Sequence, residues 1–249
     1  MSWPANSRTP DAIDGWRCPH FCQSRWMENL AALGAIDAAG EADAIATFQM
    51  LDRAYRQPWR HYHDRGHVTA CLTLFDDLRS HASDPAAIEF ALWLHDAVYV
   101  PRRSDNEARS AIWARSLLAR WQADEARRNW IAAAILATRH GLADRESSQN
   151  NPPDRDTALL LDIDLAILAA PEPVYDRYLA AIRREYSFVN DAAFREGRRT
   201  LLESWLGRDR IFHSAIGIEL FEARTRHNLQ RELDRGNRSD KLNSSRSRR

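Results

Sequence analysis

The chain has 249 residues, of which 44% are hydrophobic and nine are tryptophan, enough to bury the core of one large domain or two small ones. Its 35 basic and 35 acidic residues cancel, so no bulk charge draws it to nucleic acid or to a membrane surface. Lys241 is the only lysine and lies in the tail, which excludes Schiff-base chemistry and a P-loop lysine inside the fold.

Cysteine usage and hydropathy bear on where in the cell the protein is expected. Cys18, Cys22 and Cys71 form no disulfide framework, and no apolar run approaches the ~18 residues of a membrane span. The first residues lack the charged-then-apolar pattern of a signal peptide. We therefore expect a reduced, soluble, cytoplasmic protein without a membrane partner. Cys18, His20 and Cys22 could bind zinc, but no second ligand pair follows at zinc-finger spacing.

Apolar residues recur at helical spacing along the chain, and no stretch alternates as a strand would. Residues 1–25 are polar or contain proline, and we expect a loose lead-in there. The expected helices are 26–33, 41–57, 64–78, one that opens at 85 and carries His95-Asp96, 104–121, 125–140, 158–168, 173–187, 191–206 and 214–234.

Local signals mark several helix ends. Asp84-Pro85 reads as an N-cap followed by proline at the first helical position, and Gly34 and Gly141 as C-terminal stops. Ser104 and Glu107 have the spacing of a capping box. The sequence thus predicts one all-α domain, a bundle of about nine or ten helices over residues 26–235. Residues 236–249 are rich in Ser, Arg and Asn, and we expect a disordered basic tail.

The stretch 91–99 is apolar or small except for His95 and Asp96. A helix that is apolar on every side is normally buried, and a buried carboxylate is costly unless it is paired or bound to a cation. Imidazole and carboxylate are ligands for divalent metals. The alternative is a buried His–Asp hydrogen bond that only holds the core together.

Further polar residues fall in order around this dipeptide. His63 and His67 are four residues apart and would project from one helix face, while Asp162 and Asp164 interrupt an otherwise apolar helix. Such segments can converge in the interior of a helical bundle, where metal sites of helical proteins are built.

This order of His, His-Asp and a distant Asp resembles the HD superfamily of metal-dependent phosphohydrolases. The segment 62–68 is also similar to that of cyclic-nucleotide phosphodiesterases, which are HD relatives. The run over about residues 45–230 is most similar to a bacterial group of uncharacterised predicted metal-dependent phosphohydrolases. The resemblance therefore implies an HD-type helical domain and a phosphohydrolase activity.

Carried over to this chain, the resemblance makes four side chains the metal ligands: His67, His95, Asp96 and Asp164. Their donor atoms suit a divalent ion of Mn, Fe, Co, Ni, Zn or Mg, and the sequence does not identify which of these metals binds. Asp162 and Asp164 lie about 200° apart around a helix, so we expect only one to face the metal. Leu165 follows Asp164 as in the family pattern, which favours Asp164 and leaves Asp162 as a capping carboxylate or a partner of the ligands.

Other polar residues are candidates for chemistry or substrate contact. By likeness to the phosphodiesterase segment, His63 is the candidate general acid, or else a helix-start histidine that caps or is solvated. Glu107 is a candidate to hydrogen-bond a ligand histidine or a metal-bound water, unless it serves only its capping box. His140 is a candidate to contact substrate or to bind a second metal, although the helix dipole favours a histidine there without chemistry. Arg183 is a candidate to hold the phosphate of the substrate, and a solvated helix face is the simpler explanation for it.

The resemblance thus implies an enzyme that hydrolyses a small-molecule phosphoester, such as a nucleotide, with a metal-activated water. The alternative is a regulatory HD module that binds a nucleotide and keeps a structural metal. A di-iron oxidative enzyme is a third reading, but beyond His140 no extra histidines between 96 and 164 support it. No nucleic-acid partner is expected.

Overall fold

The computed structural model describes residues 20–35, 40–139 and 152–246, with side chains described as far as residue 237. Within these ranges the chain forms ten α-helices and two short 3-10 helices and no strand, which confirms the all-α prediction. The α-helices are α1 (Gln23–Ala32), α2 (Glu41–Tyr55), α3 (Arg65–Leu78), α4 (Pro85–Leu94), α5 (Asn106–Arg120), α6 (Glu125–Ala137), α8 (Arg155–Leu165), α9 (Glu172–Glu185), α10 (Asp191–Leu206) and α11 (Ala215–Arg246). The 3-10 helices are η1 (Arg79–His81) and η3 (Ala166–Ala169).

Side-chain caps fix where many of these helices begin. Asp64, Asp84, Asp124, Asp154 and Asn190 each accept a hydrogen bond from a backbone N–H group of the first turn that follows. These bonds satisfy donors that a helix start leaves unpaired. The predicted Asp84-Pro85 start is confirmed in this way.

Helix α4 is the centre of the bundle. It packs against α1, α3, α5, α6 and α8, and every residue from Ala87 to Leu94 is buried. The expectation that an all-round apolar helix is a buried one is therefore confirmed. Trp26 of α1 stacks on Phe90 and meets Trp93 edge-on, so large aromatic rings fill one side of this contact.

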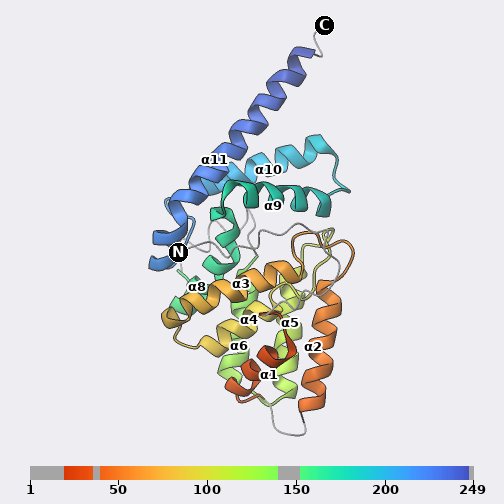
Figure 1. Ribbon diagram of the computed structural model, residues 1–249, viewed down its shortest axis with the longest axis vertical. Helices are drawn as coiled ribbons and strands as arrows, with labels where there is room; N and C mark the ends of the chain where they lie inside the picture. The colour runs from red at the N-terminus through yellow and green to blue at the C-terminus, as the bar shows by residue number, and fades with distance from the viewer. Residues whose placement is uncertain (1–19, 36–39, 140–151, 247–249) are drawn as a thin grey trace.

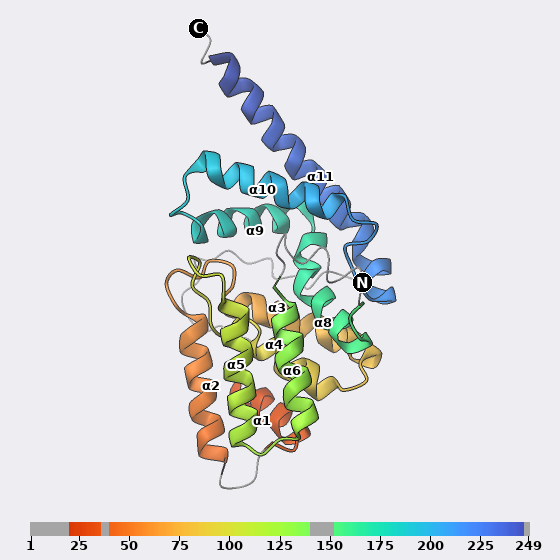
Figure 2. The same ribbon diagram turned by 180° about the vertical axis from the view of Figure 1, so that it is seen from behind.

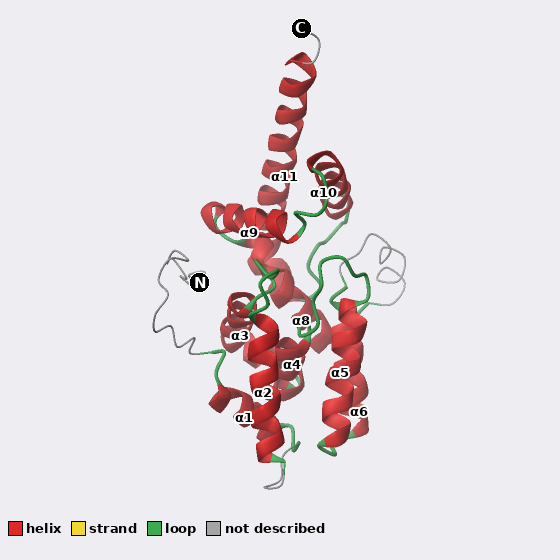
Figure 3. Cartoon of the chain, turned by 90° about the vertical axis from the view of Figure 1, so that its right-hand side faces the viewer, coloured by secondary structure: helices red, strands yellow, loops and turns green. Residues whose placement is uncertain are grey.

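The helices form a lower bundle and an upper layer (Figure 1). Helices α1 to α6 make the bundle, and α8 leads out of it toward α9, α10 and α11, as the view from behind also shows (Figure 2). Helix α11 packs on η3 and α10, and its C-terminal part projects past the other helices (Figure 3). Residues far apart in sequence thus meet where the upper layer faces the bundle.

Several helix ends differ from the prediction. Helix α4 stops at Leu94, so His95 and Asp96 follow the helix, and α8 stops at Leu165, where η3 takes over. Helix α6 ends at Ala137; the predicted end at His140 and Gly141 lies outside the described residues. Helix α5 begins at Asn106 without any side-chain cap, so the expected capping box of Ser104 and Glu107 does not form.

The two predicted terminal segments also differ. Phe21 is buried and α1 already begins at Gln23, so the packed fold starts before the expected residue 26; residues 1–19 are outside the described part. Helix α11 runs to Arg246, through most of the tail that we expected to be disordered. Extending an existing helix avoids the cost of nucleating a new one. Of the helices that the structure describes, none is both long enough and apolar enough to cross a bilayer.

Candidate metal centre

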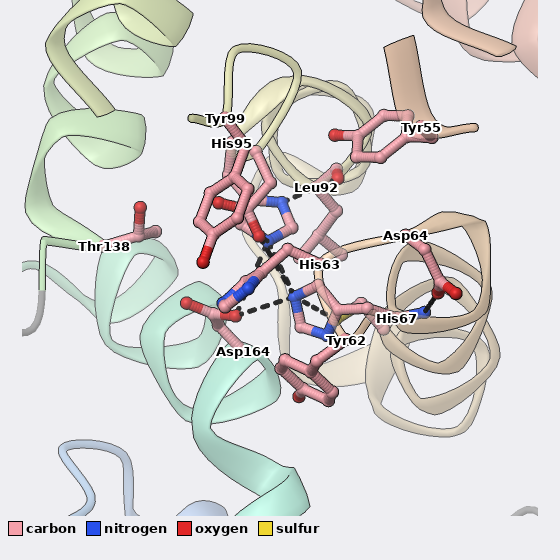
Figure 4. Close-up of polar contacts among 12 residues, drawn as sticks. Tyr55, Tyr62, His63, Asp64, His67, Leu92, His95, Tyr99, Thr138 and Asp164 are labelled. Carbon is pink, nitrogen blue, oxygen red and sulfur yellow. Dashed lines mark hydrogen bonds and ion pairs between the residues drawn. The ribbon is translucent and has the colours of Figure 1, made fainter. Parts of the chain in front are cut away.

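His67 is positioned by the cap of α3. The Asp64 carboxylate accepts hydrogen bonds from the backbone N–H groups of Gly66 at 2.7 Å and His67 at 3.3 Å. This fixes the first turn of the helix. The His67 side chain, only 3% exposed, then points to the interior (Figure 4).

His95 follows the buried helix α4 and is held by that helix's last turn. Its Nδ1 lies 2.9 Å from the carbonyl oxygen of Leu92, which can only accept a hydrogen bond. Nδ1 therefore carries a proton, and in the neutral ring Nε2 presents a lone pair. Hydrogen bonding of this kind is what orients a histidine as a metal ligand.

The four predicted ligands come together from three parts of the chain; Figure 4 shows His67, His95 and Asp164 pointing toward one another. His67 Nε2 lies 3.0 Å from His95 Nε2 and 3.1 Å from Asp164 Oδ1. Asp96 Oδ2 lies 3.3 Å from His95 Nε2 and 3.5 Å from His67 Nε2. His67, His95 and Asp164 offer ligand atoms that all lie within 4.8 Å of one another, and Asp96 adds a second carboxylate beside both rings.

The chemistry of this donor set fits a divalent metal. Two imidazole nitrogens and two carboxylate oxygens, all largely buried, suit borderline transition metals and also Mg²⁺. Burial lowers the pKa of His95, but the charges of Asp96 and Asp164 outweigh it and hold that pKa well above its usual value. Burial would raise the pKa of Asp96, yet the neighbouring histidines hold it well below its usual range. The cluster therefore favours positive charge at its centre.

Asp162 lies apart from this cluster. Its buried carboxylate accepts hydrogen bonds from the backbone N–H groups of His213 and Ser214, both at 2.7 Å, and from the Ser214 hydroxyl at 2.5 Å. Burial raises its pKa to about 6 in spite of these bonds. Of the two roles expected for Asp162, the capping role is the one found, because it faces away from Asp164 around α8.

His63 lies next to the cluster and is held by a residue that the sequence analysis missed. Its Nδ1 lies 2.7 Å from Glu185 Oε2, and its ring stacks on Tyr99 with centroids 4.3 Å apart. The Tyr99 hydroxyl donates to the same carboxylate oxygen at 2.7 Å. Burial lowers the pKa of His63, but the charge of Asp96 and the bond to Glu185 outweigh it, so the pKa is raised.

Glu185 also organises the segment that precedes α3. Its Oε1 accepts hydrogen bonds from the backbone N–H groups of residues 61, 62 and 63 at 2.8, 2.7 and 3.0 Å. Burial would raise its pKa, but these bonds and the one from His63 lower the pKa to about 2. A signal for it existed: Tyr175, Tyr178, Ile182 and Glu185 share the buried stripe of α9, so a carboxylate occupies a core position.

Arg60 joins the two ligand-bearing segments and was missed as well. Its buried guanidinium donates to the carbonyl oxygens of His63 at 2.7 Å, Asp96 at 2.8 Å and Ala97 at 3.0 Å. Three carbonyl groups that no helix pairs are satisfied at once. Arg60 therefore fixes the segment before α3 against the turn after α4.

A cavity of about 590 Å³ opens beside the cluster, and His63, Asp96, Asp164 and Glu107 all line it. Glu107 is thus near the candidate centre, although no hydrogen bond joins it to a ligand histidine among the contacts described.

Two candidates remain, Arg183 and His140. Arg183 donates to the carbonyl oxygens of Tyr186 at 2.7 Å and Val189 at 2.9 Å and pairs with Asp191 at 2.6 Å. It does not line the cavity; it ties the end of α9 to the start of α10, so the expected substrate contact is not found. His140 lies outside the described residues.

No protein-family model, curated protein or solved structure matches this chain. The fold and the site therefore define the class by themselves: an all-helical protein in which two histidines and two aspartates meet beside a cavity.

Proposed function

We propose that this protein is a metal-dependent phosphohydrolase of the HD type that acts on a small phosphoester such as a nucleotide. The observation that carries the proposal is the meeting of His67, His95, Asp96 and Asp164 at one largely buried point that borders a cavity. The order of these residues along the chain, which resembles the HD pattern, supports it further. Fold alone would not, because one fold hosts many functions.

The four side chains would hold a divalent ion, which supplies a Lewis acid for a phosphoryl oxygen and lowers the pKa of a water molecule. Asp96 and Asp164 provide the negative charge that offsets such an ion. The bond from His95 Nδ1 to the Leu92 carbonyl keeps the Nε2 lone pair directed inward. Arg60 and the Asp64 cap keep the two histidine-bearing segments in register.

His63 would act as general acid for the leaving oxygen. Its Nδ1 is engaged by Glu185, so Nε2 is the atom left to carry a proton toward the cavity that the ring lines. The Glu185 carboxylate stabilises the protonated ring and fixes its orientation. A placed acid of this kind contributes roughly 10²–10⁴-fold to the rate.

The test is elemental analysis of the purified protein together with a hydrolysis screen of phosphoesters and nucleotides with Mn, Fe, Co, Ni, Zn and Mg. We expect bound metal and metal-dependent hydrolysis, both lost in His95→Ala. The matched control is His227→Ala, which removes an exposed histidine on α11. Metal and nucleotide binding without turnover would replace the hydrolase by a regulatory module, and absence of metal would refute both.

A further inference from the structure

One wall of the cavity differs in character from the candidate metal centre. It is built by the end of α9, by α10 and by the segment between them, and apart from Arg198, whose guanidinium pairs with Glu232, its side chains are mainly apolar or aromatic. They include Ile182, Tyr186, Val189, Phe194, Leu201 and Trp205. A site with polar groups at one end and an apolar wall at the other is typical of binding sites for organic ligands, whose volumes span roughly 300–1,000 Å³; this cavity measures about 590 Å³.

Aromatic rings gather on this wall. Tyr186 stacks near Phe188 with centroids 5.8 Å apart and lies 6.2 Å from Phe194. Tyr186 and Phe194 line the cavity, and Phe188 is 37% exposed beside them. The faces of such rings take flat aromatic groups by stacking, whatever polar atoms the edge of the group carries.

Helix α10 leaves room against this wall. Ala193, Gly197 and Leu201 are spaced by four residues, so they share one helix face, and all three line the cavity. Among the residues that the structure describes, none has an atom within 4 Å of a Cβ built on Gly197. Glycine inside a helix is destabilising by about 0.5–1 kcal/mol relative to alanine, and packing among the described residues does not account for the missing side chain.

We propose that this wall, lined by α9 and α10, binds the organic part of the substrate, and that this part is a flat aromatic group the size of a nucleobase. The proposal rests on the proposed function, because the phosphoryl group at the candidate metal centre sets where the organic group falls. It deepens that function by separating nucleotide-like and aryl phosphoesters from phosphorylated sugars and polyols. Of the charged residues that line the cavity, Arg103, Glu107 and Arg139 can then meet the polar edge of the ring system.

The probes are adenosine 5′-monophosphate and ribose 5-phosphate, which share the sugar and the phosphate and differ by the base. A third probe, 1-naphthyl phosphate, has an aromatic group without a sugar. Binding to the metal-loaded protein is measured by isothermal titration calorimetry, and hydrolysis by phosphate release. We expect adenosine 5′-monophosphate and 1-naphthyl phosphate to bind roughly 10- to 100-fold more tightly than ribose 5-phosphate, the factor that stacking of one base supplies.

Gly197→Leu fills the open space with a good helix former, and Ala193→Leu does the same one turn earlier. Each should weaken binding of adenosine 5′-monophosphate by about 10-fold or more and leave ribose 5-phosphate within about 2-fold, since only the base is displaced. Gly197→Ala should shift binding in the same direction by less. Glu203→Leu adds the same side chain on the solvent side of α10 and is the control, because Glu203 is exposed and does not line the cavity.

Calorimetry keeps this proposal separate from the proposed function. Selective binding of the aromatic probes without hydrolysis of any ester would refute the hydrolase and support the aromatic wall. Equal binding of all three probes would overturn the aromatic wall even if every ester is hydrolysed. Leucine variants that are folded by circular dichroism yet keep the wild-type ratio between probes would overturn it as well.

Discussion

Replacing Glu185 by glutamine tests how the candidate site is held together. The carboxylate is 3% exposed and accepts five hydrogen bonds, three from the backbone of residues 61–63 and two from the His63 ring and the Tyr99 hydroxyl. Glutamine keeps the shape but replaces one oxygen by an NH₂ group. If the glutamine oxygen accepts the three backbone hydrogen bonds, its NH₂ group faces the His63 ring and the Tyr99 hydroxyl. Both of these groups donate to the carboxylate in the wild type, so the NH₂ group cannot replace the oxygen as their acceptor.

The magnitude follows from the pKa of Glu185. Burial would raise this pKa, but the hydrogen bonds from His63 and from the backbone outweigh burial and lower it from 4.5 to about 2. A carboxylate depressed in this way stabilises the fold by about 3 kcal/mol at pH values above the unfolded pKa. That stability is lost as the pH falls through the folded pKa, so about 2 kcal/mol remains near pH 3.5. Glutamine does not titrate, and its deficit should therefore shrink on acidification.

The assay is urea denaturation followed by circular dichroism near neutral pH and again at about pH 3.5. We expect Glu185→Gln to lower the free energy of unfolding by about 3 kcal/mol near neutral pH and by about 1 kcal/mol less in acid. Glu203→Gln on the exposed side of α10 is the matched control and should change it by less than about 1 kcal/mol. A Glu185→Gln deficit that is as small as the control's, or that does not change with pH, would refute the reasoning.

Three further outcomes are expected. Asp164→Asn should remove bound metal, whereas Asp162→Asn should keep the metal and lower the melting temperature; the reverse pattern in elemental analysis and thermal melts would contradict their placement. His67→Ala should lose metal, while His63→Ala should keep it and slow hydrolysis by ~10²–10⁴-fold, with a smaller loss on nitrophenyl esters, which need little protonation of the leaving group. Gly217→Ala should lower the free energy of unfolding by about 1–3 kcal/mol, because its Cβ would clash with the Asp162 carboxylate, and an unchanged midpoint in urea would argue against that packing.

Elements with local causes could be predicted from the sequence. The Asp84-Pro85 start of α4, the span 191–206 of α10 and the stop near Gly34, whose φ of 66° lies in the left-handed region, all depend on neighbouring residues. Where local signals compete, prediction failed. Asp105 precedes α5, but its carboxylate binds Arg103 and Arg109, so no side chain caps the helix.

The candidate ligands could be gathered from the sequence because histidines and aspartates are unusual in apolar segments and because their order resembles the HD pattern. The residues that hold them could not. Glu185 reaches His63 across 122 positions of the chain, and Arg60 reaches Asp96 across 36, through contacts that no motif encodes. Only the packing of α9 against the segment before α3 makes Glu185 a partner of the site, although its place on a buried stripe marked it as unusual.

Cobalt(II) titration of the metal-stripped protein, followed by visible absorption, tests the central claim most directly, because imidazole and carboxylate ligands change the d–d bands of the aqueous ion. We expect saturable bands in the wild type and in His227→Ala, and their loss in His67→Ala and His95→Ala, whose Nε2 atoms lie 3.0 Å apart at the centre. Absence of saturable bands in the wild type, or bands that survive both substitutions, would contradict a metal centre at this point.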